Sequence, residues 1–179
     1  MAGHPIFALP NLLSLSRFPL AVAFVLLDSP PARVTILALA ALSDLLDGWL
    51  ARRRASASRL GALLDPIADK TFVLAALLVY FVSGALSVLE FLIILSRDLA
   101  TLAGFIVAWR RTDLDPGSFR ARWMGKVTTV LQLLALLALI VRPQLVPLLI
   151  PVIAIASVAA IVDYTRSLAR RRRGARVEG

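Results

Sequence analysis

The sequence contains no cysteine and a single histidine, His4. The absence of cysteine excludes disulfide bonds and thiolate chemistry. Charge is also scarce: Asp, Glu, Lys and Arg make up 17% of the chain, with 11 acidic against 20 basic residues. With 59% apolar residues and a mean hydropathy of +0.84, the chain is far too apolar for a soluble domain of 179 residues. The composition therefore predicts an integral membrane protein.

Proline, glycine and clusters of charged residues divide the apolar sequence into about six stretches. Each stretch is close to the roughly 20 apolar residues that a helix needs to cross a bilayer. We therefore expect an all-α membrane protein with six transmembrane helices, near residues 12–28, 32–53, 60–82, 86–109, 125–141 and 144–165. Together they form a single domain over residues 1–179, whose last segment, 167–179, is a basic and flexible tail.

The arginines are distributed unevenly along this pattern. Nearly all of them lie between the second and third helices, between the fourth and fifth, and in the C-terminal tail, whereas only Arg33 and Arg142 fall on the other side. The positive-inside rule then places both termini in the cytoplasm. The net charge of +9 does not indicate nucleic-acid binding, because no basic face with interleaved aromatic residues accompanies it. Contact with anionic lipid headgroups accounts for the same charge.

Four aspartates lie close together in residues 43–70, at the predicted cytoplasmic ends of the second and third helices. Helical spacing places Asp44 and Asp47 on one stripe, and Asp65 and Asp69 follow on the next helix. An ionised aspartate at membrane depth costs about 3 kcal/mol, and neighbouring carboxylates repel each other. Oxygen ligands without histidine or cysteine favour Mg²⁺ or Mn²⁺. Four acids suffice for two such ions, an arrangement suited to displacement at phosphorus.

Other interpretations of the acids lead to other functions. A single D-x-x-D pair at a helix end is usually a solvated terminus or an ion pair, but four acids in predicted spans indicate a functional site. A cation transporter or channel could hold such carboxylates, although these cluster toward one membrane face and the chain has no detectable inverted repeat. A prenyltransferase would be expected to carry its aspartates in two separated loops of a longer chain.

Residues 44–69 read D-x2-D-G-x2-A-R-x8-G-x3-D-x3-D. This pattern resembles the signature of the CDP-alcohol phosphatidyltransferases, and every fixed position of that signature is present. The segment LPNLLSLSR (9–17) resembles the start of the family's first helix, and GKVTT (125–129) resembles a segment of its glycerophospholipid branch. The resemblance covers most of the chain. It implies transfer of a phosphatidyl group from CDP-diacylglycerol to an alcohol, with release of CMP.

The resemblance also assigns roles to the matching residues. It implies that two Mg²⁺ or Mn²⁺ ions are bound by Asp44, Asp47, Asp65 and Asp69. Asp44 and Asp65 would bridge both ions, and Asp69 would also act as general base. The residues that match the CDP-diacylglycerol site are Pro10, Asn11, Gly48, Ala51, Arg52, Ser58 and Gly61. A homodimer in the bacterial inner or plasma membrane, with its active site facing the cytoplasm, is implied as well.

The acceptor alcohol depends on residues outside the motif. A small anionic acceptor such as glycerol 3-phosphate needs basic residues, and the candidates are Arg97, inside the fourth helix, and Lys126, at the start of the fifth. The segment LSRD (95–98) resembles the form in cardiolipin synthases, whose acceptor is phosphatidylglycerol. Phosphatidylglycerophosphate synthases instead carry R-E there and a further Arg-Glu pair. The sequence therefore favours phosphatidylglycerol by a small margin, with glycerol 3-phosphate as the second option.

Overall fold

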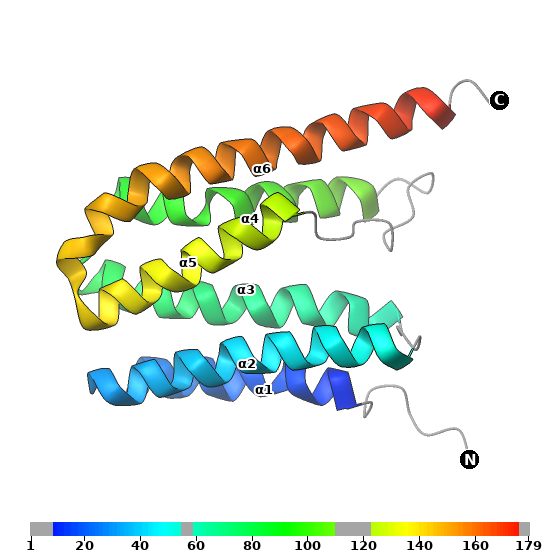
Figure 1. The fold of residues 1–179 in the computed structure, drawn as a ribbon. Coiled ribbons are helices and arrows are strands. Elements are labelled where there is room, and N and C mark those ends of the chain that lie inside the picture. Colours follow the sequence, from blue (N-terminus) through cyan, green and yellow to red (C-terminus); the bar gives the residue numbers. More distant parts are fainter. Residues whose placement is uncertain (1–8, 55–58, 110–122, 176–179) are drawn as a thin grey trace, which may run out of the picture. The chain divides into compact units, whose positions relative to one another are not determined.

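The computed structural model describes the backbone of residues 9–54, 59–109 and 123–175, and the side chains of residues 12–46, 67–100, 127–163 and 165. Within these ranges the chain is helical apart from short turns. The α-helices are α1 (Leu9–Leu26), α2 (Pro30–Arg54), α3 (Arg59–Val82), α4 (Val88–Trp109), α5 (Trp123–Val141) and α6 (Val146–Ala175) (Figure 1). A short 3-10 helix, η3 (Pro143–Leu145), precedes α6. The all-α fold class is confirmed, and each of these helices overlaps a predicted one.

The turn between α3 and α4 shows how the sequence ends one helix and begins the next. Gly84 has a φ of 77°, a conformation that glycine adopts without steric cost, and Ala85 donates a backbone hydrogen bond of 2.9 Å to the carbonyl of Tyr80. A capping box precedes α4, because the Glu90 carboxylate accepts hydrogen bonds from the Ser87 amide at 2.9 Å and the Ser87 hydroxyl at 2.7 Å. The glycine and the S-x-x-E pattern together set this helix boundary.

The largest difference between predicted and observed boundaries lies at the C-terminus. The sequence predicts a last helix ending near residue 165 and then a flexible tail, whereas α6 continues to Ala175. The residues that extend it are mostly arginine, alanine and leucine, which are strong helix formers. The helix therefore outlasts the apolar stretch because its basic continuation has high helix propensity.

One helical stretch of the described chain, Pro143–Asp163, is long and apolar enough to cross a membrane. Large apolar side chains stay exposed along this part of α6 in a helical stripe, at Leu148, Val152, Ile155, Val158 and Val162. Soluble proteins rarely expose a continuous apolar stripe of this kind. The stretch therefore indicates a membrane protein.

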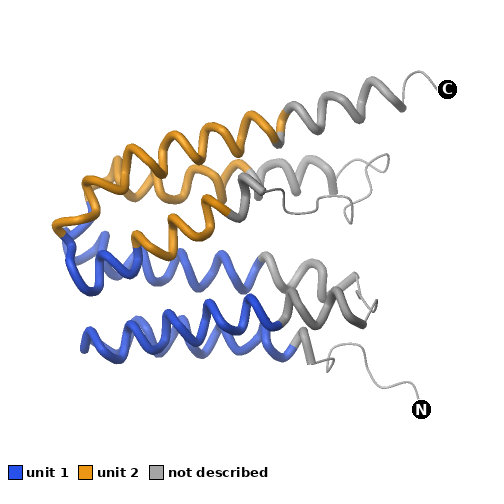
Figure 2. Tube along the Cα trace, viewed as in Figure 1, with its two compact units in different colours: residues 1–86, 136–143 blue, residues 87–135, 144–179 orange. Residues whose placement is uncertain are grey.

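The chain forms two compact units, shown in different colours in Figure 2. Unit 1 contains residues 1–86 and 136–143, and unit 2 contains residues 87–135 and 144–179. In unit 1, α1 packs along both α2 and α3, and in unit 2, α4 packs against α6. The four motif aspartates therefore belong to unit 1, and both predicted acceptor-binding residues belong to unit 2.

The helices of unit 1 pack through small and aromatic side chains. Ala21, Ala40 and Ala76 are at most 5% exposed, and such small residues let helix backbones approach closely. Phe24 of α1 is fully buried, and its ring meets that of Phe72 of α3 edge-on, with centroids 5.9 Å apart and an interplanar angle of 77°. These contacts fix α1 firmly within unit 1.

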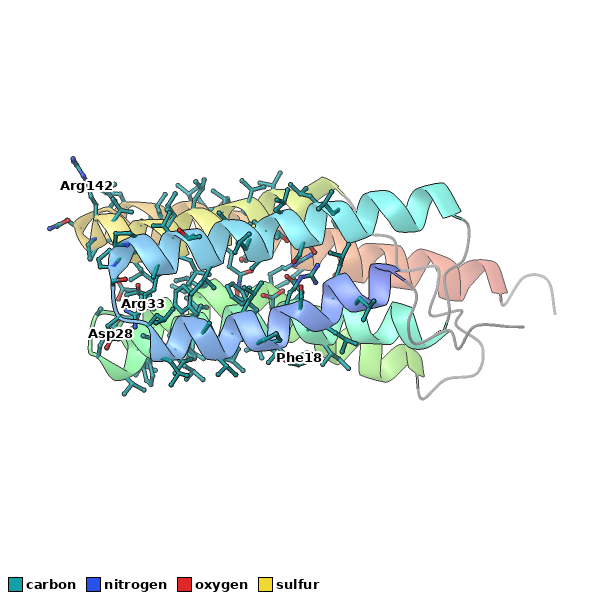
Figure 3. All side chains as sticks on the ribbon, turned by 90° about the horizontal axis from the view of Figure 1, so that it is seen from below. Phe18, Asp28, Arg33 and Arg142 are labelled. Atoms are coloured by element: carbon teal, nitrogen blue, oxygen red, sulfur yellow. The ribbon has the colours of Figure 1, made fainter. Side chains whose placement is uncertain are left out.

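Arg33, near the start of α2, forms contacts that stabilise one end of unit 1, the end opposite the motif. Its guanidinium carbon lies 5.5 Å from the centroid of the Phe24 ring and 5.4 Å from that of Tyr80. Its Nη2 donates to Asp28 Oδ1 at 2.8 Å, and Figure 3 shows these two side chains beside each other at the turn between α1 and α2. The Arg33 side chain is only 11% exposed, so this cation–π contact is largely shielded from water.

Arg33→Gln is expected to lower the free energy of unfolding by about 1–2 kcal/mol, because a shielded cation–π contact contributes that much. Thermal unfolding of the purified protein in detergent checks this. The matched control is Arg142→Gln, which changes an exposed arginine and is expected to leave the melting temperature almost unchanged. Equal shifts in the two variants would contradict a specific role for the Arg33 contacts.

Candidate active site

The two helix segments that carry the motif lie at the same end of unit 1. As Figure 1 shows, α2 ends and α3 begins at the same end of the unit, where α1 also begins. Asp44 and Asp47 lie in the second half of α2, and Asp65 and Asp69 lie in the first half of α3. The two halves of the motif therefore lie on two helices of unit 1, and their assembly into one site stays a prediction.

Two of the four aspartate side chains are described. Asp44 forms an ion pair with Arg17 of α1, with 3.1 Å between Oδ1 and Nη2; the Asp44 side chain is 44% exposed and the Arg17 side chain 1%. Asp69 is half-buried on α3. The side chains of Asp47 and Asp65 lie outside the described residues. No group of three or more metal-binding residues occurs among the side chains that are described, so the four-carboxylate cluster stays a prediction.

Six of the seven residues expected to hold CDP-diacylglycerol lie on three described helices. Pro10 and Asn11 lie in the first turn of α1. Gly48, Ala51 and Arg52 lie on α2 at helical spacing, and Gly61 lies near the start of α3. Ser58 lies outside the described residues. Side chains are likewise outside the described part of the chain for Pro10, Asn11, Gly48, Ala51, Arg52 and Gly61.

Arg17 is a candidate that the sequence analysis did not single out. Besides its ion pair with Asp44, its Nε donates a hydrogen bond to Ser43 Oγ at 3.2 Å. Both partners lie on α2, so the side chain links α1 to the motif helix. A signal was available in the sequence, because an arginine inside an apolar predicted span marks a functional position by default.

A second polar cluster joins α4 to α5 in unit 2. Arg97 Nη1 lies 3.1 Å from Asp98 Oδ1 and donates to Thr129 Oγ1 at 3.4 Å. Gln132 Nε2 donates to Asp98 Oδ2 at 2.9 Å and to the carbonyl of Ile94 at 3.3 Å. The Arg97 and Asp98 side chains are 17% and 9% exposed. The predicted acceptor-binding arginine is therefore held in a largely buried network.

Lys126, the other predicted acceptor-binding residue, lies in the first turn of α5. Its side chain is outside the described part of the chain. Both candidates therefore lie on helices of unit 2, and only the contacts of Arg97 are described.

The family model for CDP-alcohol phosphatidyltransferase matches residues 7–163. The chain therefore belongs to the CDP-alcohol phosphatidyltransferase family.

Curated relatives extend this match over most of the chain. A protein of Aquifex aeolicus (strain VF5) is 36% identical over 169 residues, which cover 87% of this chain and 93% of the relative. A protein of Pectobacterium atrosepticum is 35% identical over 147 residues, covering 77% and 79%. A protein of Escherichia coli (strain K12) is 34% identical over 148 residues, covering 78% and 80%. All three are named CDP-diacylglycerol--glycerol-3-phosphate 3-phosphatidyltransferase.

These comparisons confirm the family resemblance and support a transferase rather than a cation transporter or channel. They do not support the preference for phosphatidylglycerol as acceptor, because the relatives are named for glycerol 3-phosphate. Metal dependence, the homodimer, the six-span topology and the orientation of the termini stay predictions.

Proposed function

We propose that this protein transfers the phosphatidyl group of CDP-diacylglycerol to glycerol 3-phosphate and releases CMP. The observation that carries the proposal is that the end of α2 and the start of α3, which hold the two motif segments, lie at the same end of unit 1 (Figure 1). Relatives that cover most of the chain and are named for this reaction support the acceptor.

In the proposed reaction, Asp69 accepts the proton of the acceptor hydroxyl. The freed oxygen forms a bond to the phosphorus that carries diacylglycerol. The bond from that phosphorus to the bridging oxygen of CMP breaks, and CMP leaves with the electron pair. A half-buried carboxylate such as Asp69 is a suitable base where hydrogen-bond reach and local charge tune it.

The donor atoms of the motif fit a hard divalent cation. They are carboxylate oxygens, the ligands that such ions prefer. The two aspartate side chains that are described are accessible, since Asp44 is 44% exposed and Asp69 is half-buried. Two Mg²⁺ or Mn²⁺ ions would be held by Asp44, Asp47, Asp65 and Asp69. When bound, the ions supply stabilisation of the negative charge on the diphosphate and the leaving group.

The CDP-diacylglycerol site is proposed to combine the first turn of α1, the stripe on α2 and the start of α3. Arg52 would add a positive charge beside the diphosphate. Gly48 and Gly61 lack side chains, which lets a bulky ligand or the partner helix approach. The remaining members of the site would be Pro10, Asn11, Ala51 and Ser58.

The phosphate of glycerol 3-phosphate is proposed to bind Arg97 and Lys126. A largely buried guanidinium interacts with phosphate more strongly than an exposed one, and its planar fork suits two phosphate oxygens. Arg97, at 17% exposure, provides such a group.

The proposed topology has six membrane-spanning helices with both termini in the cytoplasm. The lengths of α2, α3 and α4, at 25, 24 and 22 residues, support it, because about 20 residues cross a bilayer. The arginine-rich connections support the orientation, which puts the motif end of unit 1 at the cytoplasmic face of a bacterial inner membrane.

The test offers four acceptors in parallel to the purified protein with Mg²⁺ and CDP-diacylglycerol: glycerol 3-phosphate, phosphatidylglycerol, inositol phosphate and serine. CMP release is expected to be at least about 100-fold faster with glycerol 3-phosphate than with serine, because a site built around a polar group rejects ligands that lack it. It is also expected to be faster than with phosphatidylglycerol or inositol phosphate, which carry bulkier groups on the phosphate. Mass spectrometry should identify phosphatidylglycerophosphate. Faster release with another acceptor would overturn the acceptor assignment, and cation flux into proteoliposomes without CMP release would overturn the transferase.

A further inference from the structure

Arg17 is a buried cation, and α1 carries no other charged residue. Its side chain is 1% exposed, and burying an unpaired charge at this depth is strongly unfavourable. Two groups on α2 compensate it: Ser43 Oγ accepts from Nε at 3.2 Å, and Asp44 Oδ1 lies 3.1 Å from Nη2. The arginine therefore holds two consecutive residues of α2 from a different helix.

The contacts around Arg17 leave it little freedom. Ser43 is itself 7% exposed, and its hydroxyl donates to the carbonyl of Ala40 at 2.8 Å. α1, which carries the arginine, packs along both α2 and α3. The position of the guanidinium is thus fixed. It contacts the Asp44 carboxylate from the buried side, while the Asp44 side chain stays 44% exposed.

We infer that Arg17 is a positioning residue that orients the Asp44 carboxylate toward a divalent cation. Residues behind a metal ligand commonly fix its orientation, and replacing them weakens metal binding by about 10- to 100-fold. The inference rests on the proposed function, in which Asp44 is a ligand. It adds to that function a contribution from α1 to the metal site.

A purely structural role makes a different prediction. If Arg17 only ties α1 to α2, its replacement destabilises unit 1 but leaves the metal affinity of the folded protein unchanged. Metal affinity and its dependence on Asp44 therefore separate the two roles.

The experiment measures Mn²⁺ binding to the full chain in detergent by electron paramagnetic resonance. Arg17→Gln is expected to weaken Mn²⁺ binding about 10- to 100-fold, and Arg17→Lys less, because it keeps the charge but loses the second donor. In an Asp44→Asn background, Arg17→Gln is expected to cause no further change, since the arginine acts through that carboxylate.

Arg33→Gln is the matched control, because it removes a buried arginine contact from the other end of unit 1. It is expected to lower the melting temperature and leave Mn²⁺ affinity unchanged. Mn²⁺ affinity within twofold of wild type in both Arg17 variants would overturn the inference alone, as would an equal loss in the Asp44→Asn background. Absence of Mn²⁺ binding by the wild-type protein would overturn the proposed metal site and the inference together.

Discussion

Asp69→Asn is expected to reduce CMP release by about 10³-fold or more. The side chain keeps its size, but the amide cannot accept the proton of the acceptor hydroxyl, and general-base catalysis contributes factors of this order. The half-buried position of Asp69 in the first half of α3 gives asparagine the same surroundings. The rate of CMP release with CDP-diacylglycerol, glycerol 3-phosphate and Mg²⁺ measures the effect.

Measuring the activity of Asp69→Asn at increasing metal concentration distinguishes the role of Asp69 as general base from its role as metal ligand. If the residue served only as a ligand, saturating Mn²⁺ would restore the activity of the variant, whereas loss of the base leaves activity low at any metal concentration. The matched control is Asp163→Asn, which changes a half-buried acid on α6 in unit 2 and is expected to retain activity. Activity of Asp69→Asn within tenfold of wild type would remove Asp69 from the base role.

The helices could be predicted from the sequence because their ends are marked chemically. The turn at Gly84, the capping box at Ser87 and Pro143 before α6 interrupt apolar runs at the observed boundaries. Only α6 continues well past its predicted end, because the residues after its apolar stretch are mostly polar but have high helix propensity.

The packing of these helices could not be predicted in the same way. A helix that is apolar on all sides carries no stripe that identifies its neighbour. That α1 packs along both α2 and α3, and that Phe24 meets Phe72, follows from shape and not from a pattern. The ion pair between Arg17 and Asp44 joins residues far apart in sequence, so the partner of Arg17 could be identified only from the fold.

The acceptor was the weakest inference from sequence for a related reason. The argument rested on the dipeptide Arg97–Asp98 in place of R-E and on the absence of a further Arg-Glu pair, although an aspartate and a glutamate can pair with the same arginine. The structure contains the Arg97–Asp98 pair at 3.1 Å, which a glutamate could also form with one more methylene. Identity of 36% over 169 residues to a relative named for glycerol 3-phosphate carries more information about the acceptor than these two local differences.

Arg97→Lys is expected to raise the KM for glycerol 3-phosphate about 10- to 100-fold, while the KM for CDP-diacylglycerol stays within about twofold. Lysine keeps the positive charge but loses the planar fork that binds two phosphate oxygens, and each tenfold change corresponds to about 1.4 kcal/mol. Steady-state kinetics with each substrate varied in turn provides both values. Arg142→Lys, at an exposed arginine, is the control and should change neither KM.

The network around Arg97 makes this prediction specific. Gln132 donates to Asp98 at 2.9 Å, so Gln132→Met removes a contact of Asp98 and leaves the arginine itself in place. If Asp98 aligns Arg97 for the phosphate, this variant should raise the same KM by a smaller factor than Arg97→Lys. If the network serves only to join α4 to α5, both variants should lower the melting temperature with no change in either KM, and Arg97 would then be excluded as an acceptor ligand.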